Sequence, residues 1–152
     1  MITQQGCVAG LDFGTVRIGI ALSDPERILA SPHETYIRQS PNRDAEYFQR
    51  LVKEEHVIRF VLGMPLHLNG GLSEKAKEVL QFGQWLKKIT GIEIDYMDER
   101  YTSVEAEYLL HNAHLTNKKR KARRDKIAAQ IILSAYLESG CRGITDFSGI
   151  DD

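Results

Sequence analysis

The chain is short of cysteine, and the cysteines it has form no pattern. Cys7 and Cys141 lie near opposite ends of the 152 residues, which excludes a disulfide framework and a cluster of zinc ligands. No apolar run approaches membrane-spanning length, and residues 1–6 lack the basic start and the apolar run of a signal peptide. We therefore expect a cytoplasmic protein in a reducing compartment, with no membrane association.

The chain also lacks an excess of charge of either sign. Its 20 lysines and arginines and its 21 aspartates and glutamates give a formal net charge of -1, so any attraction to nucleic acid must come from a local patch. The length and the 42% hydrophobic content fit one soluble domain with a core of its own. We expect this domain to span residues 1–140, followed by a flexible C-terminal tail at 141–152, where hydrophobic periodicity is weak.

The spacing of hydrophobic residues predicts three strands, and then helices and strands in alternation. Strands are predicted over residues 7–11, 17–22, 33–38, 57–62 and 92–97. Helices are predicted from Ser40 and Pro41, from Ser73 to Gly91, over residues 102–113, and from Asp125 to near Gly140. This order predicts an α/β fold whose mixed central sheet begins with an antiparallel hairpin meander and carries helices on both faces.

Four acidic residues stand at the ends of predicted elements. Asp12 ends the first strand, Asp98 and Glu99 follow the last strand, and Asp125 opens the last helix. Functional sites in open α/β sheets gather at the carboxyl ends of strands, so we expect the first two places to be neighbours. Helical spacing puts Asp125 in line with an apolar stripe, containing Ile132, that should pack inward. Periodicity alone does not decide whether Asp98 or Glu99 enters the site.

Acids brought together in this way need a counter-charge. Three carboxylates within about 5 Å of one another would repel by roughly 3 kcal/mol per pair at an effective dielectric constant near 20. Protonation of one acid is one solution. Mg²⁺ or Mn²⁺ is another, because these hard cations prefer carboxylate oxygen. Each acid also has a simpler interpretation, as a turn residue beside Gly14, a solvated strand end, or a helix N-terminus that the dipole favours.

The stretch 118–126 is the most basic part of the chain. It is either a solvated helix face or a surface that binds the phosphates of a nucleic acid. The residues that we expect to contact nucleic acid are Arg17, Arg100, Lys118, Lys119, Arg120, Lys121 and Arg123. The histidines show no metal-ligand spacing. Helical spacing favours a place in the core, rather than a base-stacking role, for Tyr47, Phe48, Phe82 and Trp85.

Four short motifs follow one another in order between about residues 8 and 138. They are Asp12-Phe13-Gly14-Thr15, Gly63-Met64-Pro65 with Asn69-Gly70, Asp98-Glu99-Arg100 with Thr102, and Asp125-Lys126-Ile127-Ala128-Ala129. Each motif alone is weak, but the ordered set is specific. The chain resembles the YqgF (RuvX) family of bacterial proteins, whose members are described as pre-16S rRNA nucleases and as Holliday-junction resolvases.

This resemblance implies a ribonuclease H-like fold and hydrolysis of phosphodiester bonds with Mg²⁺ or Mn²⁺. It implies a role in ribosome biogenesis, in which precursor rRNA, on its own or in ribosomal particles, is matured at the 5′ end of its 16S segment. The resemblance assigns catalysis and metal binding to Asp12, Glu99 and Asp125, and so prefers Glu99 to Asp98. Branched DNA is the alternative substrate, as for a resolvase.

Two other classes of function stay open. Asp-x-Gly-Thr after a first strand also occurs in actin-like, chaperone and sugar-kinase folds, which suggests an ATP-binding half domain as one alternative. A nucleic-acid-binding module without catalysis is the other. The oligomeric state, the number of metal ions and the choice between endonuclease and exonuclease do not follow from the sequence.

Overall fold

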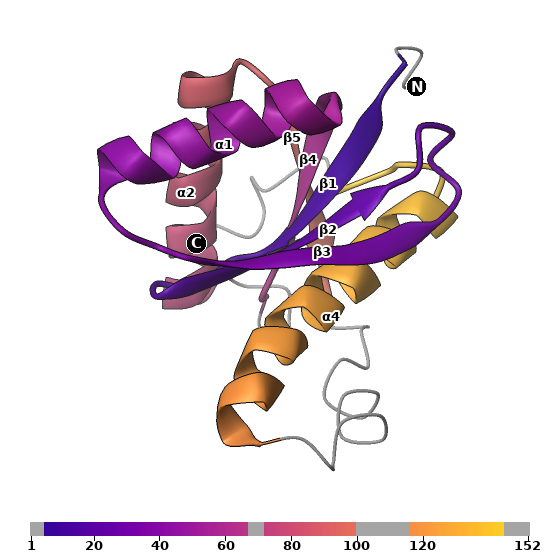
Figure 1. The fold of residues 1–152 in the computed structure, drawn as a ribbon. Helices are drawn as coiled ribbons and strands as arrows, with labels where there is room; N and C mark the ends of the chain where they lie inside the picture. Colours follow the sequence, from indigo (N-terminus) through magenta and orange to yellow (C-terminus); the bar gives the residue numbers. More distant parts are fainter. Residues whose placement is uncertain (1–4, 67–71, 100–115, 145–152) are drawn as a thin grey trace.

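The computed structural model describes residues 5–66, 72–99 and 116–144. These residues form one five-stranded sheet, in the order β3-β2-β1-β4-β5, with helices packed against it (Figure 1). The strands are β1 (Cys7–Asp12), β2 (Arg17–Ser23), β3 (Ala30–Ile37), β4 (Val57–Met64) and β5 (Ile94–Asp98). The helices are α1 (Pro41–Glu55), α2 (Glu74–Thr90) and α4 (Asn117–Glu138). None of these helices is long and apolar enough to span a bilayer.

The sheet is mixed, as predicted. β1, β2 and β3 form an antiparallel meander, whereas β4 lies parallel to β1 and β5 lies parallel to β4. Short turns suffice for the antiparallel pairs, but parallel neighbours need a crossover, which α1 supplies before β4 and α2 supplies before β5. The carboxyl ends of β1, β4 and β5 therefore share one edge of the sheet.

The two faces of the sheet carry separate cores. α1 and α2 lie together on one face and α4 crosses the other (Figure 1). Along β1 the side chains alternate between them: Ala9 and Leu11 belong to the cluster under α1 and α2, and Val8 belongs to the cluster under α4. By the same alternation, Asp12 falls on the α4 face. Asp125, the helical acid of the predicted site, belongs to the helix on this face.

Two glycines let α4 come unusually close to the sheet. A Cβ atom on Gly10 of β1 would lie 2.7 Å from the Cβ atom of Leu133, and one on Gly19 of β2 would collide with the backbone oxygen of Asp125. Any larger residue at either position would push the helix outward. The inward-facing stripe of α4 is buried as predicted and ends on Tyr136, which is fully buried.

The ends of α1 and α2 also follow the prediction. Ser40 caps α1 and Ser73 caps α2, since each hydroxyl accepts a hydrogen bond from a backbone N–H three residues later. Gly91 ends α2 in the left-handed conformation with φ 73°.

The start of α4 differs from the prediction. We expected Asp125 to open this helix, but the helix begins at Asn117 and Thr116 caps it by accepting a hydrogen bond from the Lys119 N–H. The lysines and arginines that follow are good helix formers, so the basic stretch is helical and Asp125 lies about two turns inside. β3 also starts three residues earlier than expected. The helix predicted over residues 102–113 lies outside the described residues.

Candidate active site

Asp12 and Asp125 meet across one residue of β2. Asp12 pairs with Gly19 in the β1–β2 register, and Gly19 lies directly beneath the backbone of Asp125. The close seat of α4 on Gly19 therefore brings its third turn to the end of β1. Asp125 is therefore close enough to Asp12 to act on its charge, although 113 positions separate the two residues in the chain.

Glu99 reaches the same place from the other side. It follows β5 directly, and a Cβ atom on Gly63 of the neighbouring strand β4 would collide with its Oε1 atom. The same Cβ position lies 2.5 Å from the Cδ1 atom of Ile132 on α4, so the Glu99 carboxylate lies on the α4 face of the sheet. Because β4 lies next to β1, the glycine at position 63 gives Glu99 room beside Asp12.

The electrostatics link Asp12 to both Glu99 and Asp125, and we call these three acids the acidic cluster. Burial raises the pKa of Asp12 to about 7, and the negative charges of Glu99 and Asp125 add to this rise. Burial also raises the pKa of Glu99, and the charge of Asp98 adds to that effect. Asp98 therefore acts on Glu99, whereas Glu99 and Asp125 act on Asp12. Periodicity left the choice between Asp98 and Glu99 open, and the geometry brings Glu99 into the cluster.

Asp125 has an internal cationic partner. The Nε atom of Arg17, at the start of β2, donates a hydrogen bond to Oδ2 of Asp125 at 2.8 Å. The Asp125 side chain is 18% exposed and that of Arg17 is 35% exposed, so the ion pair is only partly screened by solvent. Across residues 5–66, 72–99 and 116–144, no three Asp, Glu, His or Cys side chains are arranged to hold a metal ion. Asp125 engages Arg17 instead.

Lys75 is a member of this site that the sequence did not reveal. It lies in the exposed first turn of α2, and the Ser73 hydroxyl fastens this turn to the end of β4 by donating to the Pro65 carbonyl at 2.9 Å. Its positive charge lowers the pKa of both Asp12 and Glu99, against the effect of burial. A lysine in a first helical turn opposes the helix dipole, and this unfavourable placement was the available signal.

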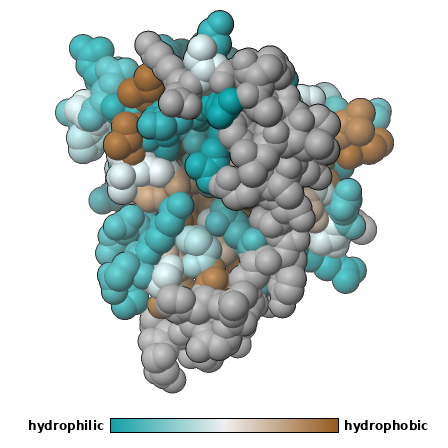
Figure 2. Space-filling model, turned by 90° about the horizontal axis from the view of Figure 1, so that it is seen from below, coloured by the Kyte–Doolittle hydropathy of each residue, from teal (hydrophilic) through white to brown (hydrophobic). Residues whose placement is uncertain are grey.

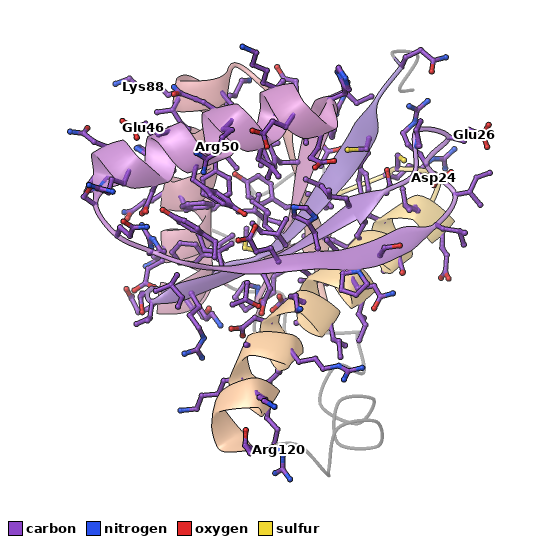
Figure 3. The ribbon with its side chains drawn as sticks, viewed as in Figure 1. Asp24, Glu26, Glu46, Arg50, Lys88 and Arg120 are labelled. Atoms are coloured by element: carbon purple, nitrogen blue, oxygen red, sulfur yellow. The ribbon has the colours of Figure 1, made fainter. Side chains whose placement is uncertain are left out.

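The basic stretch forms the exposed beginning of α4. Lys119, Lys121 and Arg123 are exposed on its first turns, which extend past the sheet at the lower end of Figure 1. Figure 3 places Arg120 at this tip, directed away from the sheet. Seen from this end, the coloured surface is mostly hydrophilic (Figure 2). The side chains of Lys118 and Arg100 lie outside the described residues, so their predicted roles stay predictions.

The aromatic residues divide into two groups. Phe48 and Phe82 are buried in the core under α1 and α2, as the sequence predicts. Tyr47 and Trp85 are half-buried and pack against the same core from its rim. Tyr47 donates a hydrogen bond to Glu34.

Comparisons with known proteins give the same family as the motifs. The model of the RuvX family, described as "Holliday junction resolvase", matches residues 6–139. A protein of Rhodopirellula baltica named "Putative pre-16S rRNA nuclease" is 44% identical over 144 residues, which cover 95% of this chain and 83% of that protein. A protein of the same name from Syntrophomonas wolfei is 43% identical over 136 residues, with 90% of this chain and 96% of that protein covered.

Solved structures agree on the fold. The structure titled "T. thermophilus RuvC in complex with Holliday junction substrate" superposes with a TM-score of 0.59, at 14% identity, over 90% of this chain and 98% of that chain. At this identity the comparison bears on the fold alone. It confirms the predicted ribonuclease H-like architecture. Because the family match and the curated relatives both span most of the residues, the chain belongs to the RuvX family, a family of nucleases.

Proposed function

We propose that this protein is a metal-dependent nuclease that cleaves phosphodiester bonds at Asp12, Glu99 and Asp125, and that it acts in 5′-end maturation of pre-16S rRNA. The observation that carries the proposal is the half-buried Asp12 carboxyl, whose pKa is raised to about 7 beside two further carboxylates. A group held in this way is costly to ionise unless a cation joins it. Perturbed acids at the carboxyl edge of an α/β sheet are typical of a functional site.

The chemistry of the donor set, rather than its present arrangement, fits Mg²⁺ or Mn²⁺. All three candidate ligands offer carboxylate oxygen, which hard divalent cations prefer, and the set contains no thiolate or imidazole. A divalent cation would offset the repulsion that Glu99 and Asp125 exert on Asp12. Arg17 now neutralises Asp125, so we expect it to compete with the cation for this ligand. When bound, the metal would lower the pKa of a coordinated water and stabilise charge on the scissile phosphate.

The side chains of the protein have separate roles in binding the metal, neutralising the phosphate and binding the nucleic acid. The three acids hold and orient the reacting groups, and no serine, cysteine or histidine is needed as a covalent nucleophile. Arg17 and Lys75 flank the carboxylates and can neutralise the phosphate that is cleaved. The exposed Lys119, Lys121 and Arg123 grip the backbone beyond the cleaved bond, with little dependence on base sequence.

Precursor rRNA is the substrate that we propose, because relatives that are 44% and 43% identical over most of this chain are named as pre-16S rRNA nucleases. A four-way DNA junction is the second candidate, since the description of the matching family model names it. Both substrates present the same phosphodiester chemistry to the acids. The choice between them therefore rests on the shape of the bound nucleic acid.

The test is a cleavage panel with Mg²⁺ or Mn²⁺, comparing RNA that spans the 5′ end of 16S rRNA with single-stranded RNA, duplex DNA and a four-way junction. We expect cleavage of the precursor RNA, and loss of at least about 100-fold in rate for Asp12→Asn with RNA binding retained. Asp24→Asn, at the far β2–β3 turn shown in Figure 3, is the matched control. Undiminished cleavage by Asp12→Asn would remove the assignment. Tight ATP binding without cleavage would favour the ATP-binding alternative.

A further inference from the structure

A pocket of about 400 Å³ opens between the β1–β2 turn and the helices α1 and α2. Its volume lies within the range of small-ligand sites. The residues that line it include Phe13, Thr15, Arg38, Gln81, Phe82 and Trp85. None of these residues belongs to the acidic cluster, so the pocket is separate from the proposed catalytic centre.

The inner wall of the pocket is aromatic. The rings of Phe13 and Phe82 lie 4.8 Å apart between centroids, and those of Phe82 and Trp85 lie 5.5 Å apart with 35° between their planes. Phe13 and Phe82 are almost fully buried, which leaves the half-buried Trp85 as the ring with the most accessible surface. A flat, polarizable surface of this kind stacks well against another flat π-system.

A guanidinium group completes this surface. The Cζ atom of Arg38 lies 5.3 Å from the centroid of the Phe13 ring and 5.7 Å from that of Phe82. Its Nε donates to Oδ2 of Asp44 at 3.4 Å, and one of its terminal nitrogens donates to the Gly14 carbonyl at 3.5 Å. Asp44 is itself buried and accepts hydrogen bonds from the Tyr36 hydroxyl and the Gln39 N–H. The guanidinium is thus held in place before any ligand arrives.

The combination identifies the class of ligand. Aromatic faces beside a fixed guanidinium are the means by which proteins hold unpaired nucleotides, with the rings stacking on the base and the cation facing the phosphate. Thr15 and Gln81 add hydrogen-bonding groups at the rim, where the edge of a base could be contacted.

The pocket also lies close to the proposed catalytic edge. Phe13 follows Asp12 directly in the chain and turns to the opposite face of the sheet, into the core under α1 and α2. The two sites therefore share the end of β1, with the acids on the α4 side and the pocket on the α2 side. A strand whose phosphate is at Asp12 can place a neighbouring base in the pocket by passing over the edge of the sheet.

We propose that this pocket holds one unpaired base of a single-stranded segment of the nucleic acid, next to the bond that is cleaved. The inference rests on the proposed nuclease function for its biological sense, but the binding itself can be measured without cleavage. It predicts that the protein prefers substrates with an unpaired nucleotide at the cleavage site over continuous duplex.

The chain provides its own reporter, because Trp85 is its single tryptophan. The experiment titrates the full-length Asp12→Asn protein, in the presence of a chelator, with a short single-stranded RNA and follows tryptophan fluorescence. A second titration uses the same backbone with abasic positions throughout. We expect quenching by the base-containing RNA and at least about tenfold weaker binding of the abasic strand. Equal affinity for both strands, or fluorescence unchanged at saturation, would overturn the proposal.

A pair of helix-surface variants distinguishes RNA binding in the pocket from a general effect of negative charge on RNA binding. Gln81→Glu adds a second acid to the pocket lining, beside Glu78, and Gln84→Glu makes the same change at an exposed site on the same helix that does not line the pocket. We expect Gln81→Glu to weaken RNA binding about fivefold or more and Gln84→Glu to have little effect. Equal effects of the two variants would contradict the pocket. Both positions are exposed, so neither change threatens folding.

The outcomes distinguish this inference from the proposed function. Base-dependent quenching by a protein that cleaves no substrate would support the pocket and refute the nuclease assignment. Cleavage by the wild-type protein, combined with equal binding of abasic and normal strands, would refute the pocket and leave the nuclease assignment intact.

Discussion

Arg17 and Asp125 form an ion pair, with 2.8 Å between Nε and Oδ2, inside the cluster that we assign to metal binding. The pair joins the first residue of β2 to the third turn of α4. It gives one of the three acids a counter-charge that belongs to the protein itself. A cation that enters the cluster must therefore compete with a guanidinium for Asp125.

Replacement of Arg17 tests this competition. We expect Arg17→Gln to bind Mn²⁺ about fivefold more tightly, because Asp125 no longer has an internal partner whose half-buried ion pair contributes about 1 kcal/mol. Isothermal titration calorimetry with Mn²⁺ measures the affinity. Arg50→Gln, which removes an exposed ion pair with Glu54 on α1, is the control. Unchanged or weaker affinity in Arg17→Gln would show that the ion pair does not oppose the metal.

The acidic cluster should make stability depend on pH in the absence of metal. Asp12 has a pKa of about 7 when folded and an ordinary value near 3.8 when unfolded, so the folded state holds the proton more tightly between these values. The free energy of unfolding should fall as pH rises from about 4 to 7, and Asp12→Asn should reduce this fall, to which the raised pKa of Glu99 also contributes. At neutral pH we expect this variant to be more stable by up to about 4 kcal/mol, which corresponds to the rise in pKa from 3.8 to about 7. Urea denaturation across pH, in a chelator, measures the effect.

Asp24 supplies a control of opposite sign. Its carboxylate accepts hydrogen bonds from the backbone N–H groups of Ile28 and Leu29, and these bonds lower its pKa. Asp24→Asn should therefore lower stability above the unfolded pKa, and the difference from wild type should shrink in acid. If Asp12→Asn and Asp24→Asn changed stability in the same direction at neutral pH, the assignment of Asp12 would be wrong.

Lys75 should set the pH dependence of cleavage. Removal of its charge in Lys75→Ala leaves Asp12 and Glu99 with a higher pKa, because Lys75 lowers both. The acid limb of the pH–rate profile should move to higher pH, with a rate about two- to threefold lower near pH 6 and little change above pH 8. Lys77→Ala, which loses an exposed ion pair with Glu74, should leave the profile in place. A uniform loss of rate at every pH would point to substrate binding instead.

A single methyl group on Gly19 should disturb the packing of α4 on β2. A Cβ atom at Gly19 would meet the backbone of Asp125, so we expect Gly19→Ala to lower stability by about 1–3 kcal/mol and to weaken metal binding. Gly83→Ala is the matched change on α2, where the new methyl group meets the movable hydroxyl end of Tyr96. Thermal unfolding of both variants measures the difference. Equal costs would contradict the close approach of α4.

The exposed basic turns should control the salt dependence of binding. Replacement of Lys119, Lys121 and Arg123 by glutamine removes up to three phosphate contacts, so the slope of log K against log salt should fall by about 2–3. The same replacement of Lys53, Lys87 and Lys88, on the α1 and α2 side, provides a control of equal charge. Filter binding of a single RNA at several salt concentrations measures both slopes. Equal loss in the two triple variants would show that only net charge matters.

Most of the fold could be predicted from the sequence, whereas the assignment of the three acids came from the resemblance to a family and stays a prediction. Alternation along β1 and the capping residues of α1 and α2 are local signals, and they predicted these elements well. The start of α4 was missed because Asp125 is a good N-terminal residue, and this local preference hid the cap at Thr116. The Thr116 cap sets where the helix begins, and only the packing of α4 on Gly19, which no local pattern encodes, sets which turn of the helix reaches the site.

The arrangement of the acids shows the same limit. Two-residue periodicity could not choose between Asp98 and Glu99, because the choice depends on the missing side chain at Gly63 on another strand. Lys75 was missed for a related reason, since it reaches the cluster only through the attachment of Ser73 to Pro65. The ion pair of Arg17 with Asp125 joins positions that only the completed fold brings together.

The seat of α4 has a consequence for the time at which activity can appear during synthesis. All five strands precede this helix in the chain, yet Asp125 reaches the cluster only when the helix docks on the first two of them. A nascent chain that has emerged only as far as β5 contains Asp12 but not Asp125. The site that we propose is therefore complete only after α4 has been synthesised and has docked on the sheet.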